Sequence, residues 1–173
     1  AYAAQRFGEA EKKYLEVLSL DPANVYTLAN LGAAQMELNK LPEAESHLKR
    51  ALSLDPDDAF SLSLLGLLKF RQQKSDDAFD ALSRAAKLDP DNAQTQNYLG
   101  LVLSMKGQRE AAEAAFRKAI QIAPGYAVAH YNLAVYYATQ NPPTRELARW
   151  HYQKALTVGH PKSDELEKLL ARN

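Results

Sequence analysis

The sequence predicts an all-α solenoid of stacked helix pairs, because one phrase recurs along it at a fixed interval. Leu-Asp-Pro ends at Pro22, Pro56 and Pro90, and an altered copy, Ile-Ala-Pro, ends at Pro124. Successive prolines are therefore 34 residues apart. A period of this length is typical of solenoids, in which each repeat is one supersecondary unit that is stabilised by its neighbours.

Residues 25–58, 59–92 and 93–126 align without a gap, and each block carries two stripes of mostly apolar residues at helical spacing. The first stripe, at i, i+3, i+4 and i+7, consists of Leu28, Leu31, Gly32, Gln35; Leu62, Leu65, Gly66, Lys69; and Gln96, Leu99, Gly100, Leu103. The second, at i, i+4, i+7 and i+8, consists of Ala44, Leu48, Ala51, Leu52; Ala78, Leu82, Ala85, Ala86; and Ala112, Phe116, Ala119, Ile120. Each block is thus predicted to be a helix, a short turn and a second helix.

Small and capping residues fit this plan. A glycine inside a helix costs about 1 kcal/mol against alanine, so Gly32, Gly66 and Gly100 indicate close approach of two helices. Three residues stand two positions after a proline and are expected to cap the next helix: Asn24, Asp58 and Asn92. Inside the blocks, Pro42 suits a first helical position, Ser75 an N-cap and Gly107 a helix end.

With its leucines and glycines in the first helix, Ala44, Leu48 and Ala51 in the second, and Pro56 at the close, the pattern resembles the tetratricopeptide repeat (TPR) family over nearly the whole chain. The resemblance implies a right-handed superhelix of antiparallel helix pairs. One departure is that the aromatic that the family often places early in the first helix is replaced by Leu28, Leu62, Gln96 and His130.

The two ends are less regular. Residues 1–24 match only the second half of a repeat, through Ala10, Tyr14, Val17 and Leu18. Residues 127–161 form a divergent repeat with a longer turn at Asn141-Pro142-Pro143, and residues 162–173 are predicted to be a capping helix. Because the first repeat lacks most of its first helix, we expect the chain to be a fragment that is cut at its N terminus and native at its C terminus.

Composition excludes several functions. Lys plus Arg equals Asp plus Glu, at 21 each, which argues against the basic surface of a nucleic-acid binder or a polybasic membrane patch. The absence of cysteine excludes disulfides and thiolate metal sites. No apolar run approaches the roughly 20 residues that span a bilayer. The sequence names no compartment and no cofactor.

Nothing in the sequence supports catalysis. The four histidines lack metal-site spacing, and His130 is expected to be a hydrogen-bonded packing residue. Acidic runs at Asp55 to Asp58 and at Asp76 and Asp77 lie at helix starts, where they complement the helix dipole. Trp150 lies off the packing stripe, so it should either face outwards or lie beneath the terminal helix; of the two, we expect burial beneath that helix.

The resemblance implies that ligands, usually extended peptides or helices, lie in a concave groove formed by the remaining face of the first helices. We predict a largely uncharged, aromatic-rich groove there, made of Tyr26, Asn30, Phe60, Leu64, Phe70, Asn97, Tyr98, Tyr131 and Asn132. The alternative for Phe60, Leu64 and Phe70 is packing between adjacent first helices. The Lys, Arg and Asn clamp with which chaperone-binding members hold an acidic peptide terminus is missing in either register, so that function is excluded.

We therefore predict a protein- or peptide-binding scaffold without catalysis. Two alternatives stay open: a substrate-recruiting arm of a larger enzyme, and a self-assembling module that associates through the apolar face of its incomplete first repeat. The expected partner is a protein or peptide, with no nucleic acid and no membrane insertion.

Overall fold

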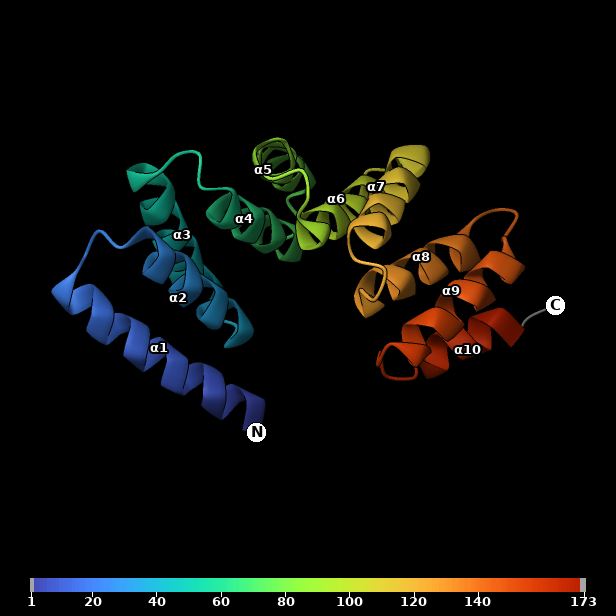
Figure 1. The fold of residues 1–173 in the computed structure, drawn as a ribbon, viewed down its shortest axis with the longest axis horizontal. Coiled ribbons are helices and arrows are strands. Elements are labelled where there is room, and N and C mark those ends of the chain that lie inside the picture. Colours follow the sequence, from blue (N-terminus) through green and yellow to red (C-terminus); the bar gives the residue numbers. More distant parts are fainter. Residues whose placement is uncertain (1, 172–173) are drawn as a thin grey trace. The chain divides into compact units, whose positions relative to one another are not determined.

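The computed structural model describes residues 2–171, and all the regular elements in that range are helices. They are α1 (Tyr2–Leu20), α2 (Val25–Glu37), α3 (Leu41–Leu54), α4 (Ala59–Arg71), α5 (Ser75–Leu88), α6 (Ala93–Met105), α7 (Arg109–Ile122), α8 (Ala127–Thr139), α9 (Arg145–Thr157) and α10 (Asp164–Ala171) (Figure 1). The predicted all-α class is confirmed. Each of the predicted complete repeats contains one helix pair.

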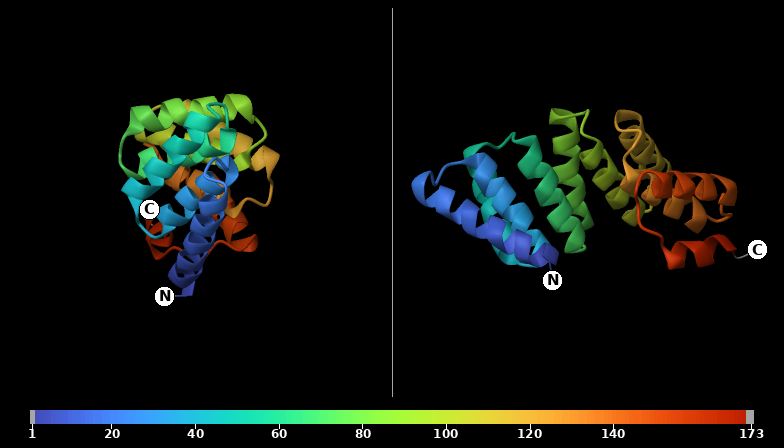
Figure 2. Two further views of the ribbon diagram at one scale, coloured as in Figure 1. Left: turned by 90° about the vertical axis from the view of Figure 1, so that its left-hand side faces the viewer. Right: turned by 60° about the horizontal axis from the view of Figure 1, so that its bottom comes forward.

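The helices form two compact units, which divide after Pro90. The N-terminal unit contains α1 to α5, and the C-terminal unit contains α6 to α10. In both, a first helix packs against the second helix that follows it, as in α2 with α3 and α8 with α9 (Figures 1 and 2). Within residues 2–171, no helix has the length and apolar character that crossing a membrane requires.

The core of the N-terminal unit lies where two first helices meet the second helix between them. Its buried residues come from α2, α3 and α4 and are Ala29, Met36, Ala44, Leu48, Leu64 and Leu68. The first helices of neighbouring repeats therefore pack directly on each other as well as on α3, which buries positions that a single helix pair would leave exposed.

The helical glycines mark the closest approach within each pair, as predicted. A Cβ added at Gly66 would lie 2.4 Å from the Cγ of Leu82, and one at Gly100 would lie 2.6 Å from a ring carbon of Phe116. Distances below 3.0 Å force the neighbouring side chain to move. Packing rather than flexibility thus explains these glycines.

The predicted caps are present at three of the four repeat starts. The Asn24, Asp58 and Asn92 side chains each accept a hydrogen bond from the backbone N–H three residues on, at 2.9, 2.8 and 3.0 Å. Tyr126, at the equivalent position before α8, caps no N–H group of the described chain. The prediction for Ser75 is wrong: α5 begins at Ser75 itself, and the cap position belongs to Lys74.

An arginine of a second helix holds two of the proline turns, those at Pro22 and Pro56. Arg50 Nη2 donates to the Pro22 carbonyl at 3.2 Å, and Arg84 Nη2 donates to the Pro56 carbonyl at 2.9 Å. Both pairs are 28 residues apart. The Leu-Asp-Pro turns at Pro22 and Pro56 are therefore held by arginines that recur at the same period.

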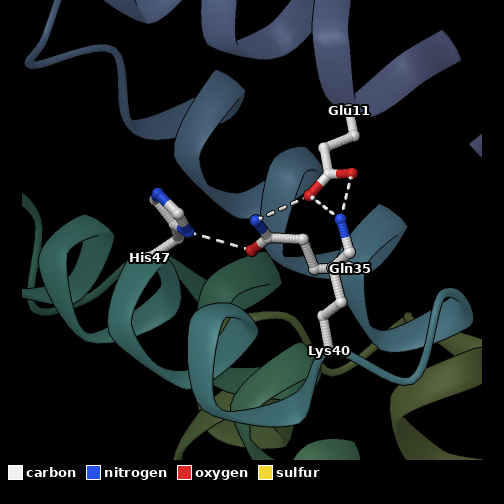
Figure 3. Close-up of polar contacts among 4 residues, drawn as sticks. All are labelled: Glu11, Gln35, Lys40 and His47. Atoms are coloured by element: carbon white, nitrogen blue, oxygen red, sulfur yellow. Dashed lines mark hydrogen bonds and ion pairs between the residues drawn. The ribbon is translucent and has the colours of Figure 1, made fainter. Parts of the chain in front are cut away.

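Polar residues on the packing stripe are linked to the preceding second helix. The buried Gln35 of α2 donates to Glu11 of α1 at 3.2 Å, and Lys40 Nζ lies 2.7 Å from the same carboxylate (Figure 3). The hydrogen bond from Lys40 is the largest cause that lowers the pKa of Glu11. His47 Nδ1 lies 2.9 Å from both the Gln35 Oε1 and the Glu43 carbonyl; because both are acceptors, Nδ1 carries the proton.

The same link recurs one period later. Glu45 of α3 accepts from the buried Lys69 of α4 at 2.7 Å, from Gln72 at 3.1 Å and from Lys49 at 2.7 Å. Hydrogen bonds from Lys49, Lys69 and Gln72, in that order, lower the pKa of Glu45 to about 2. In the C-terminal unit, Glu113 instead accepts from the Tyr137 hydroxyl at 2.7 Å.

Helix α10 closes the C-terminal unit by burying Leu166 and Leu170. The prediction that Trp150 lies beneath this helix is wrong, because its side chain is 53% exposed. Tyr152 takes that place: it is buried, and its hydroxyl accepts a hydrogen bond from the Ser163 N–H at 2.8 Å.

Candidate functional site

The predicted groove residues all lie on first helices, at positions outside the packing stripe; we call the side of the first helices that carries them the first-helix face. In the N-terminal unit, Tyr26 is 71% exposed and Phe60 is 39% exposed. Asn30 and Phe70 are half-buried, and the Asn30 amide donates to the Tyr26 carbonyl at 2.8 Å. Two large aromatic side chains are therefore open to solvent on adjacent first helices.

Two of the predicted residues are buried instead. Leu64 belongs to the core cluster between α2, α3 and α4, which is the packing alternative considered for it. Asn97 is 0% exposed, and its Oδ1 accepts from the Asn132 amide at 2.9 Å. Both lie where adjacent first helices touch, so neither side chain is accessible to a ligand in this structure.

In the C-terminal unit the remaining candidates are partly held by neighbours. The Tyr98 hydroxyl accepts from Gln94 at 2.6 Å. The Tyr131 ring stacks on His160 with centroids 4.2 Å apart, and its hydroxyl donates to Ser163 at 3.3 Å. Tyr98 and Asn132 are half-buried. This part of the first-helix face is consequently more enclosed than the part around Tyr26.

Each unit has a cavity at the end of this face, beside a proline turn. The N-terminal cavity, of about 530 Å³, is lined by Val25, Tyr26, Asn30, Asp55, Asp58 and Phe60. The C-terminal cavity, of about 510 Å³, is lined by Ala93, Gln94, Ala123, Pro124, Gly125 and Tyr126. Val25, Tyr26, Asp55 and Asp58 are each 68 residues, or two periods, before a residue of the second cavity. The two cavities are thus the same architectural feature.

Their chemistry differs because the proline phrase changes. Asp55 and Asp58 place two carboxylates in the N-terminal cavity, whereas Ala123 and Tyr126 stand at the equivalent positions of the other. Burial raises the pKa of Tyr126 to about 12, so its hydroxyl is uncharged at neutral pH. For Asp55 and Asp58 the sequence predicts only helix starts and capping, because periodicity does not reveal that the turn that carries them lines a cavity with α2.

Two histidines of the last repeat, the buried His130 and the half-buried His151, form a pair. His130 Nε2 lies 3.1 Å from the Pro124 carbonyl and so carries a proton, which leaves Nδ1 to accept from His151 Nδ1 at 3.0 Å. Burial, and then the proximity of His130 and Arg117, lowers the pKa of His151 to about 4. The predicted packing role of His130 is confirmed. Among residues 2–171, no group of three His, Asp or Glu side chains is placed to hold a metal ion.

Comparison with known proteins identifies the repeats. Two family models, both described as tetratricopeptide repeat, match residues 1–68 and 63–127. The crystal structure of MamA is 33% identical, covers 88% of both chains and has a TM-score of 0.70. Curated protein sequences give no match.

More distant structures share the fold. TTC0263, a thermophilic TPR protein from Thermus thermophilus, is 23% identical over 98% of this chain and 91% of its own, with a TM-score of 0.80. YrrB, a TPR protein with an unusual peptide-binding site, is 23% identical over 94% of this chain and 81% of its own, with a TM-score of 0.66. From the two family models and the identity to MamA, the chain belongs to the tetratricopeptide repeat family.

Proposed function

We propose that the chain is a peptide-binding scaffold without catalysis, and that the first-helix face is its binding surface. The observation that carries this proposal is that Tyr26 and Phe60 are both exposed and both line the N-terminal cavity. Aromatic side chains are the residues that most often anchor a bound peptide, and exposed apolar patches next to a cavity mark interaction sites.

The accessible part of the predicted groove fits a peptide. In the N-terminal unit, Tyr26, Phe60 and Phe70 offer apolar contacts and the Asn30 amide can hydrogen-bond a ligand's main chain. In the C-terminal unit, Asn132 carries such an amide. Leu64 and Asn97 support this surface from below by packing adjacent first helices together. The peptide-binding site of YrrB indicates that this fold accommodates peptides.

The proposal is tested with a displayed library of random peptides, each about twelve residues long, that is selected against the wild-type chain. Affinities of the recovered peptides are then measured by fluorescence anisotropy for wild type and for Phe60→Glu and Tyr98→Glu. Burying a charge in an apolar contact should weaken binding by about tenfold or more.

Leu147→Glu is the matched control, because Leu147 on α9 is 41% exposed, as Phe60 nearly is, and lies outside the first helices. It should retain wild-type affinity, and circular dichroism should report equal helicity for all variants. Failure to recover any peptide, or equal affinity in Phe60→Glu and Leu147→Glu, would remove the first-helix face as the binding surface.

Self-association is a second candidate, which the exposed apolar side chains of α1 favour. Val17, which belongs to the predicted apolar face of Tyr14, Val17 and Leu18, is 41% exposed, and Leu20, three residues on, is 88% exposed. Tyr14 and Leu18 are half-buried. If Val17 and Leu20 join two copies, sedimentation should find a dimer that Val17→Glu with Leu20→Glu converts to a monomer. A monomeric wild type at about 100 μM, a concentration on the scale of weak complexes, would dismiss this candidate.

A further inference from the structure

We propose that the N-terminal cavity is a subsite for a basic side chain, arginine or lysine, of the bound peptide. This inference rests on the proposed function and names the ligand chemistry of one part of the surface. The observation that supports it is that two aromatic rings, an amide and two carboxylates line one cavity of about 530 Å³.

The carboxylates are oriented by the backbone of the turn between α3 and α4. Asp55 Oδ1 accepts from the Asp57 N–H at 3.1 Å, and Asp58 Oδ2 accepts from the Ser61 N–H at 2.8 Å. Each uses one oxygen for this purpose. These hydrogen bonds hold both carboxylates at the cavity wall before a ligand binds, so binding a cation costs less side-chain entropy.

The turn carries more negative charge than its own cation balances. Arg84 lies 3.1 Å from Asp57 and also donates to the Pro56 carbonyl. Among residues 2–171, Asp55 and Asp58 receive hydrogen bonds from backbone N–H groups and form no ion pair. A cationic ligand would therefore meet two carboxylates that no described side chain neutralises.

The start of α4 would by itself attract an anion, because the N-terminal end of a helix is positive. Asp58 already occupies that position as the cap, and Asp55 adds a second negative charge to the same cavity. Repulsion between like charges then excludes an acidic ligand. The electrostatics of the cavity select a cation.

Tyr26 and Phe60 complete the subsite. Their ring faces can attract an ammonium or guanidinium group and cover the aliphatic stem of its side chain, a contribution of about twofold to fivefold in affinity at an exposed site. The equivalent cavity of the C-terminal unit, which Ala123 and Tyr126 line, offers no carboxylate from its lining residues. Preference for a basic residue should hence be a property of the N-terminal cavity.

The test is an NMR titration of the ¹⁵N-labelled chain with N-acetylarginine amide, and separately with the citrulline analogue, which has nearly the same shape and no charge. Ionic strength is kept constant with NaCl. We expect saturable shifts of the Val25, Tyr26 and Phe60 amide signals with the arginine compound, and an affinity for the citrulline compound that is lower by about fivefold or more.

Asp55→Asn with Asp58→Asn removes both charges and leaves each side chain an Oδ1 that can accept its backbone hydrogen bond, as Asn24 and Asn92 do at the positions equivalent to Asp58. This variant should lose at least about fivefold in affinity for the arginine compound. Asp21→Asn is the control: Asp21 holds the equivalent place in the turn before α2 and lies outside the cavity lining. It should leave the affinity unchanged.

Equal binding of the two compounds, absence of saturable shifts at the cavity, or an unaffected double variant would each overturn the subsite. The library selection separates this failure from failure of the proposed function. If recovered peptides bind wild type and the double variant alike and lack basic residues, the first-helix face remains a peptide site and only the subsite is refuted.

Discussion

In the N-terminal unit the turn before α4 places Asp55 and Asp58 at a cavity, whereas the equivalent turn of the C-terminal unit places Ala123 and Tyr126 there. The polar links on the packing stripe differ in the same way. Glu45 accepts from the cation Lys69 in the first unit, whereas in the second unit Glu113 accepts from the Tyr137 hydroxyl, beside the His130–His151 pair.

This difference teaches that one periodic backbone can carry two kinds of surface. The stripe positions must be small or apolar because neighbouring helices touch there, so they repeat. The positions that line the cavities, and those that form the polar contacts between helices, are under less steric constraint. The residue type at these positions can therefore change from one repeat to another within one chain. Predictions about acid sensitivity, packing and charge follow from the comparison.

The largest effect is expected from acidification of the C-terminal unit. The pKa of His151 is depressed from its usual 6.5 to about 4 in the folded state. The contribution of the neutral ring to the free energy of unfolding is therefore complete above pH 6.5 and is lost as the pH falls toward 4. The loss should reach about 2 to 3 kcal/mol, somewhat less than the full shift would give, because solvent partly screens the half-buried ring.

Hydrogen exchange of α8 and α9 amides against pH measures this loss. His151→Gln removes the titrating group and should flatten the curve. An equally steep curve in that variant would refute the role of the pair.

Tight packing is shared by both units, and Gly66→Ala tests it in the N-terminal one. Alanine favours a helix by about 1 kcal/mol over glycine, but the new Cβ would press on Leu82, so a net loss of about 2 kcal/mol is expected. Gly8→Ala is the control, since its Cβ would meet no described atom within 4 Å, and it should stabilise the chain. Urea unfolding compares the two; a stabilising Gly66→Ala would contradict the packing argument.

A smaller effect is expected at Glu45. Glu45→Gln keeps one acceptor oxygen for Lys49 and Lys69, places an amide nitrogen where Oε2 accepts from Gln72, and removes the charge that faces Lys69, which should cost about 1 kcal/mol at neutral pH. The pKa of Glu45 is depressed from 4.5 to about 2, so the stability that its carboxylate adds to the folded state is present above pH 4.5 and is lost as the pH falls toward 2. Urea unfolding at neutral pH and at about pH 3 should show the cost of the substitution shrinking in acid. A cost that stays constant would contradict the link.

The sequence predicts most of the fold because the packing stripe is sterically constrained. The helix pairs, the close approach at Gly66 and the capping by Asn24 each depend only on neighbours within one period, so periodicity reveals them. The prediction fails for Trp150, whose burial depended on which aromatic of α9 meets α10.

The candidate site is less predictable for a physical reason. Helical periodicity assigns a residue to a face, but whether Leu64 or Asn97 is buried depends on how closely the next first helix approaches. The cavities likewise arise where the turn that ends a repeat faces the first helix of the same repeat. Asp58 therefore has two roles, capping and lining, and only the first is visible in sequence.

The central claim is that equivalent cavities differ in ligand preference because of a few side chains on a shared backbone. Its most direct test is to transfer the acidic subsite to the C-terminal unit with Gln94→Tyr, Ala123→Asp and Tyr126→Asp, and to titrate that variant with N-acetylarginine amide by NMR. Saturable shifts of the residue 93 and 94 amides, which wild type should lack, are the predicted result. A variant that keeps its helical amide pattern yet gives no such shifts would contradict the claim.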